Sequence, residues 1–187
     1  MVMTLPRFPR VVRTLASATA VGALMSACAM LPSQMAVPAS ASGPDLDALF
    51  VSRAAQTDMM ELTASRMALQ RATRPEVRQY AQSMINDHGR TSAELQQIAS
   101  QIGMPVDSRP TAMDEKKMTA LSAAQGEAFD KAYVKVVGVQ AHTEAVTLFK
   151  QEASKGSNPA LRSFATRTLP ALQHHLQMAE QLEKTVN

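Results

Sequence analysis

With 187 residues, 45% of them hydrophobic but only two tyrosines and no tryptophan, the chain can form one domain with a substantial core, and its composition favours helices. The single cysteine excludes a fold held by intrachain disulfides. Of its 19 basic residues, Arg7, Arg10 and Arg13 precede Cys28, and the remaining 16 balance the 16 acidic residues. The mature part is therefore formally neutral, and we expect no nucleic-acid partner.

Residues 1–28 have the pattern of a signal peptide. Residues 1–13 contain three arginines and no acidic residue, and residues 11–27 are mostly apolar and small apart from Arg13 and hydroxyl residues, as in the n- and h-regions of exported proteins. A membrane-spanning helix needs about 20 predominantly apolar residues, so this run is too short and too polar for one. We predict export, to the periplasm or to an outer-membrane-anchored position.

The cleavage site has two interpretations. Residues 24–28 resemble a lipoprotein box, although Met25 stands where leucine is usual, and Cys28 would then carry a lipid anchor as the only membrane contact. Ala27-Cys28-Ala29 also fits ordinary signal cleavage. An unpaired cysteine in an oxidising compartment favours lipidation of Cys28. Residues 29–44, rich in Ala, Ser and Pro, are predicted to link this end to a helical domain over 45–185.

Two long helices are predicted in the first half of that domain. From Asp45 to Ala72 apolar residues recur at helical spacing. Thr73 and Glu76 have the spacing of a capping box, and the helix that follows ends at Gly103. The first stripe comprises Leu46, Leu49, Phe50, Ala54, Ala64 and Ala68, and the second comprises Val77, Ala81, Met84, Leu95, Ala99 and Ile102.

The second half repeats this pattern after a longer connection. Residues 104–121 contain a predicted short helix over 113–121, and a third long helix follows over 122–155. The fourth begins at Ser157-Asn158-Pro159. Pro170 interrupts its apolar stripe and is predicted to kink it.

The connection over 104–121 can span roughly 40 Å, enough to return along a 28-residue helix. The other two connections are only a few residues long, so they join antiparallel pairs. We therefore predict an all-α, ferritin-like four-helix bundle with a long crossover that carries a short helix.

Each predicted long helix places one ionisable residue on its apolar face: Glu61, His88, His142 and His175. His174 is rotated toward solvent. All four residues lie near mid-height of their helices, so the bundle can bring them together. One carboxylate and three imidazoles suit Zn²⁺, Fe²⁺ or Mn²⁺.

Neighbouring carboxylates would complete such a site, because Asp58 and Asp87 can orient the imidazoles by accepting hydrogen bonds from them. The spacing does not match a di-iron ferritin site, which needs Glu-x-x-His on two helices. Ile85, Val139 and Leu172 stand three residues before the histidines. A mononuclear site is the metal hypothesis that remains.

Two alternatives stay open beside it. The four residues can satisfy one another by hydrogen bonds in a polar core layer of a non-catalytic envelope bundle that acts in stress tolerance or partner binding. The methionines, which lack a repeated thioether motif, fit core packing better than copper binding. No nucleophile elbow, phosphate-binding glycine loop or paired-acid motif indicates a reaction.

Several blocks in order resemble a family of exported bacterial proteins, domain of unknown function 4142, often labelled outer-membrane proteins. The resemblance covers about residues 45–183. It rests on Phe50-Val51-Ser52-Arg53-Ala54-Ala55, Asp87-His88, Phe129-Asp130 with Tyr133, Ala141-His142-Thr143-Glu144, Thr168-Leu169-Pro170 and His174-His175. It implies a ferritin-like bundle in the cell envelope and no established reaction. Its matching positions include three of the four inward residues, which favours metal binding.

Overall fold

The computed structural model describes residues 44–186. The predicted signal peptide, Cys28 and residues 29–43 of the predicted linker lie outside this range. Regular structure within it is entirely helical. The elements are α1 (Pro44–Arg71), α2 (Pro75–Gln101), α3 (Ala112–Ala123), α4 (Gly126–Tyr133), the π-helix η1 (Val134–Ala141), α5 (His142–Lys155) and α6 (Pro159–Val186).

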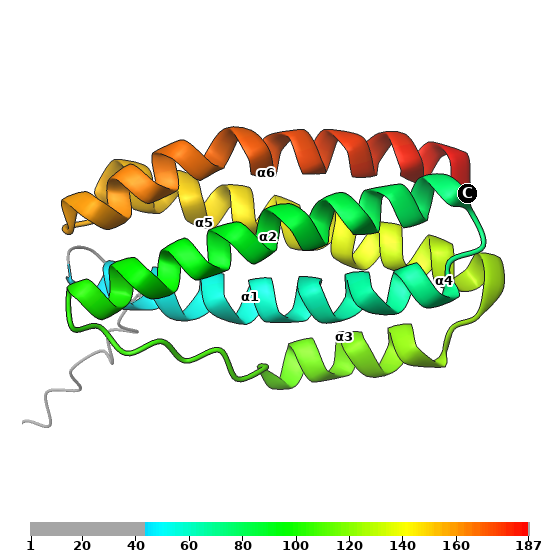
Figure 1. The fold of residues 1–187 in the computed structure, drawn as a ribbon, viewed down its shortest axis with the longest axis horizontal. Helices are drawn as coiled ribbons and strands as arrows, with labels where there is room; N and C mark the ends of the chain where they lie inside the picture. The colour runs from blue at the N-terminus through cyan, green and yellow to red at the C-terminus, as the bar shows by residue number, and fades with distance from the viewer. Residues whose placement is uncertain (1–43, 187) are drawn as a thin grey trace, which may run out of the picture. The chain divides into compact units, whose positions relative to one another are not determined.

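Four long helical rods form the bundle (Figure 1). Three of them are α1, α2 and α6, and the third in chain order consists of α4, η1 and α5, which follow one another without a break. Short connections join α1 to α2 and α5 to α6, so each pair is antiparallel. The segment after α2 runs back along the bundle before the third rod begins (Figure 1). This confirms the all-α bundle with a long crossover that carries a short helix.

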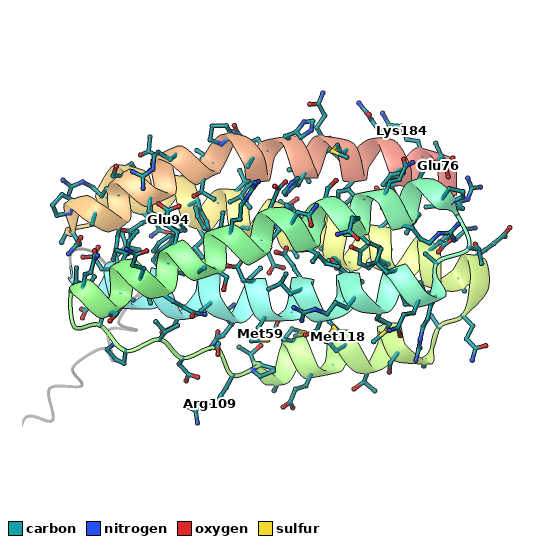
Figure 2. All side chains as sticks on the ribbon, in the orientation of Figure 1. Met59, Glu76, Glu94, Arg109, Met118 and Lys184 are labelled. Carbon is teal, nitrogen blue, oxygen red and sulfur yellow. The ribbon has the colours of Figure 1, made fainter. Side chains whose placement is uncertain are left out.

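The crossover helix α3 packs on the outside of α1. Met59 of α1 and Met118 of α3 lie beside one another and line a common apolar hollow (Figure 2). A capping box starts α3, since Thr111 Oγ1 accepts from Asp114 N at 3.1 Å and Thr111 N donates to Asp114 Oδ2 at 3.0 Å. The third rod begins at Gly126, where φ is 58°, and not at Ser122 as predicted.

Two apolar clusters fill the bundle, one toward each end. In one cluster Phe50 contacts Phe149 and Phe164, with ring centroids 4.9 and 6.2 Å away. The other contains Tyr80, Phe129 and Tyr133. The residues of the two predicted stripes are buried except for Ile102, which is half-buried, and Leu49, which is 46% exposed and was wrongly placed in the core.

The start of α2 is capped from a different helix. The predicted capping box at Thr73 is wrong, because the N-cap residue is Arg74 and it makes no side-chain cap. Instead the buried Asp130 of α4 accepts from Thr73 N at 3.1 Å and from Arg74 N at 3.0 Å. Its carboxylate also accepts from Thr73 Oγ1 at 2.5 Å. A negative charge at this end of a helix is favourable.

α6 continues through Pro170, and its ribbon is arched without a sharp kink (Figure 1). None of the helices within residues 44–186 is both long enough and apolar enough to span a membrane.

We expect Asp130→Ala to lower the free energy of unfolding by about 1–2 kcal/mol, because it removes the acceptor of the Thr73 and Arg74 amides just before α2. Urea denaturation measures the change. Glu127→Ala, on the exposed side of the same helix, is the control. Equal effects of the two substitutions would contradict the assigned cap.

Candidate metal centre

The four inward residues predicted from the sequence meet between the two apolar clusters. Glu61 lies on α1, His88 on α2, His142 at the start of α5 and His175 on α6. All four are buried, with exposed fractions of 0–3%. The three imidazole rings form a nearly equilateral triangle, with centroids 5.4, 5.4 and 5.5 Å apart.

One nitrogen of each ring contacts an oxygen acceptor, which fixes the ring's orientation. An ionised carboxylate or a carbonyl can only accept, so these nitrogens, which we call the outer nitrogens, carry the hydrogen. The contacts are His88 Nδ1 to Asp58 Oδ1 at 2.8 Å, His142 Nδ1 to Val137 O at 3.0 Å and His175 Nε2 to Asp87 Oδ2 at 2.9 Å. Asp58 and Asp87 thus each hold one of the imidazoles.

The other nitrogen of each ring is buried without a hydrogen-bond partner among the described residues. These three, His88 Nε2, His142 Nε2 and His175 Nδ1, we call the inner nitrogens. The three histidines can each offer one ring nitrogen such that all three atoms lie within 4.8 Å of one another. An ion bonded to three imidazoles at about 2.0–2.1 Å would hold the ring centroids roughly 5–5.5 Å apart, close to the triangle found here.

The π-helix η1 sets the position of His142. Its wider turn brings the carbonyl of Val137, five residues earlier, onto His142 Nδ1. Gly138 lets η1 approach α6, because an added Cβ would lie 2.7 Å from Ala179 Cβ. Neither feature was predicted from the sequence, since a backbone acceptor has no residue signature and a glycine within a helical stretch was the only clue.

Glu61 lies on the outer side of two of the rings. Its Oε2 is 3.0 Å from His88 Nδ1, and its Oε1 is 3.4 Å from His142 Nδ1. Those nitrogens direct their hydrogens to Asp58 and Val137, so within residues 44–186 neither Glu61 oxygen has a well-aligned donor. Burial raises the pKa of Glu61, but the adjacent histidines, above all His88, outweigh burial and lower it.

The three histidines differ in their affinity for protons. Burial lowers the pKa of His88, but the adjacent Glu61 and Asp58 outweigh burial and raise it to about 10. Burial and the positive charge of His88 lower the pKa of His175 to about 4. Burial likewise lowers the pKa of His142. At neutral pH the cluster therefore contains one imidazolium and two neutral imidazoles, whose inner nitrogens carry lone pairs.

The family described as domain of unknown function (DUF4142) matches residues 32–182. The chain belongs to this family. No curated protein shows significant sequence similarity to it.

The DUF4142 bundle is similar in fold to two solved structures described as DUF305 and to a solved structure of CopM. A DUF305 fragment from Deinococcus radiodurans aligns with a TM-score of 0.67 and 14% identity, covering 78% of this chain and 99% of that chain. A candidate secreted DUF305 protein from Streptomyces coelicolor aligns with a TM-score of 0.65 and 14% identity, covering 75% of this chain and 92% of that chain. CopM in its Cu(II)-bound form aligns with a TM-score of 0.65 and 19% identity, covering 75% of this chain and 97% of that chain. At these identities the likeness concerns the fold.

We expect Gly138→Ala to lower the free energy of unfolding by about 1–3 kcal/mol, because the new methyl group would push η1 away from α6. Gly89→Ala is the matched control, since its Cβ would meet nothing within 4 Å, and it should stabilise α2 by up to about 1 kcal/mol. Thermal denaturation of the two variants measures both changes. Gly138→Ala as stable as Gly89→Ala would show that the close approach is unimportant.

Proposed function

We propose that this domain binds a divalent transition-metal ion through the inner nitrogens of His88, His142 and His175. The supporting observation is a buried cluster of three histidines whose ring nitrogens can lie within 4.8 Å of one another, each ring having one nitrogen that lacks a partner within the described residues. Buried polar atoms without partners are rare in folded proteins, and a metal ion would satisfy all three at once. The outer nitrogens are already held by oxygen acceptors, as in many protein sites where histidines bind metal.

Copper(II) is the first candidate for this ion. Neutral imidazoles suit copper, zinc, iron and nickel, and copper(II) has the highest affinity among the divalent first-row metals at most nitrogen sites. CopM, whose fold is similar, has a structure in a Cu(II)-bound form. Among the ions expected from the sequence, Zn²⁺ and Fe²⁺ also accept imidazole, whereas Mn²⁺ prefers oxygen ligands.

The carboxylates around the triad favour a cation there. Asp58 and Glu61 lie on His88, and Asp87 lies on His175 at the edge of the cluster. Two apolar clusters enclose the site and lower the local dielectric constant, which strengthens these charge interactions. Three protein nitrogens also leave a coordination position for a small exogenous ligand.

We further propose that the bundle works in the cell envelope. The predicted signal peptide and the candidate lipidation site Cys28 support export. The intact mass of the mature protein isolated from membranes tests this, since a lipidated Cys28 adds the mass of its acyl groups. A mature mass that still includes residues 1–28 would contradict export by cleavage.

Removing any one histidine of the triad should weaken Cu(II) binding at the triad at least about 100-fold, because the ion loses one of three protein ligands. The variants are His88→Ala, His142→Ala and His175→Ala, compared by competition with a copper chelator. His174→Ala is the matched control, since His174 is adjacent in sequence but exposed, and it should bind like the wild type.

Metal should also raise the melting midpoint of the wild type and not that of the triad variants, by ligand linkage. Wild-type protein that binds no metal, or triad variants that bind metal like His174→Ala, would contradict the proposal. Those results would favour the alternative in which the polar layer only fixes the register of the helices.

Cu(II) affinity should rise about tenfold per pH unit from pH 7 toward pH 10. The pKa of His88 is raised to about 10, so below that pH the ion must displace one proton from this ring, whereas the lowered pKa values of His142 and His175 leave those rings neutral. Titration calorimetry in buffers of different ionisation enthalpy counts the released protons. Affinity that does not change between pH 7 and 9 would contradict this assignment.

A further inference from the structure

We propose that a second divalent cation binds between Asp58, Glu61 and the outer nitrogen of His88, so that the His88 ring bridges two ions. This inference rests on the proposed function, because the first ion is the one held by the three inner nitrogens. His88 is the one residue that belongs to both groups of metal-ligating side chains found in the described part of the chain, the histidine triad and the group Asp58, Glu61 and His88.

The carboxylate face of His88 has the spacing of a coordination set. His88 Nδ1 lies 2.8 Å from Asp58 Oδ1 and 3.0 Å from Glu61 Oε2. Two atoms bound to one ion at about 2.0–2.2 Å, with angles of 90–110°, lie roughly 2.8–3.6 Å apart. All three residues are buried, with exposed fractions of 3%, 9% and 0% for His88, Asp58 and Glu61.

Glu61 supplies the observation that distinguishes this face from an ordinary acidic cluster. Nδ1 of an imidazole can donate one hydrogen, and Asp58 accepts it. Glu61 therefore faces the same nitrogen as a second acceptor, and within the described range neither of its oxygens receives a hydrogen bond. The charge of His88 stabilises this buried carboxylate, but its oxygens have no donor aligned with them, and a bound cation would give them direct contacts.

The net charge of the cluster also favours a second cation. Three carboxylates touch the histidines, namely Asp58, Glu61 and Asp87. One divalent ion leaves an excess of one negative charge on this group. A second ion would displace the Nδ1 proton of His88 to solvent, and two divalent cations would then balance three carboxylates and one bridging imidazolate.

The two faces differ in the metal they should prefer. Three imidazole nitrogens suit Cu(II), whereas two carboxylate oxygens and one nitrogen form a harder set that also accepts Zn²⁺. This pairing differs from the ferritin di-iron site, whose sequence pattern the chain lacks, because here an imidazole would join the ions. The competing arrangement is a single ion to which Glu61 turns as a fourth ligand, as first expected from the sequence.

Titration of the full mature chain with Cu(II) alone tests the second site by stoichiometry and by electron paramagnetic resonance. We expect the wild type to bind two ions, with a spin intensity well below that of two isolated Cu(II) ions because the ring couples them. Glu61→Gln and Asp58→Asn should each bind one ion at full spin intensity. Glu94→Gln, an exposed carboxylate paired with Arg167 on the surface, is the matched control and should bind two (Figure 2).

The possible results separate this inference from the proposed function. If the wild type binds one ion, the second site is wrong and the triad site still stands. In that case Glu61→Gln should lower the affinity for the single ion only if Glu61 is its fourth ligand. Two ions with full spin intensity overturn the bridge. No binding by the wild type overturns both proposals. Circular dichroism checks the folding of each variant, and the wild-type stoichiometry and spin intensity decide the question even if both variants unfold.

Discussion

The burial of three imidazoles and a carboxylate at mid-height of a four-helix bundle is the constraint on which the rest of this structure depends. Each ring is held by an oxygen from a fixed position, Asp58, Val137 or Asp87. One residue of slippage in any rod would turn its side chain by about 100° and break the arrangement. The hydrogen bonds of the polar layer are therefore satisfied in this register of the four rods, while the apolar clusters on either side supply most of the driving force.

The irregular parts of the fold serve this layer. The π-helix η1 supplies the carbonyl that orients His142, and Gly138 lets that segment lie against α6, which carries His175. A regular α-helix would direct the carbonyl of Val137 to the backbone amide four residues later and not to an imidazole. The local departure from α-helical geometry is thus explained by the position that His142 must reach.

Helical periodicity predicted the bundle, its crossover and the inward position of Glu61, His88, His142 and His175, because burial of one face dictates that pattern. It failed where a distant segment decides the local structure. Asp130 of α4 accepts from the backbone just before α2, at Thr73 and Arg74. A rule based on neighbouring residues points to Thr73 and cannot identify an acceptor that lies on another helix. The side of the rings on which Glu61 lies likewise depends on rotamers and on the π turn, which periodicity does not describe.

The central claim is that the inner nitrogens of the triad bind a metal ion, and X-ray absorption spectroscopy tests it most directly. Protein loaded with one equivalent of Cu(II) should show about three imidazole nitrogens at about 2.0 Å, with the outer-shell scattering typical of histidine rings. His175→Ala should lose about one of the three. A spectrum without histidine scattering, or one unchanged in His175→Ala, would contradict the account.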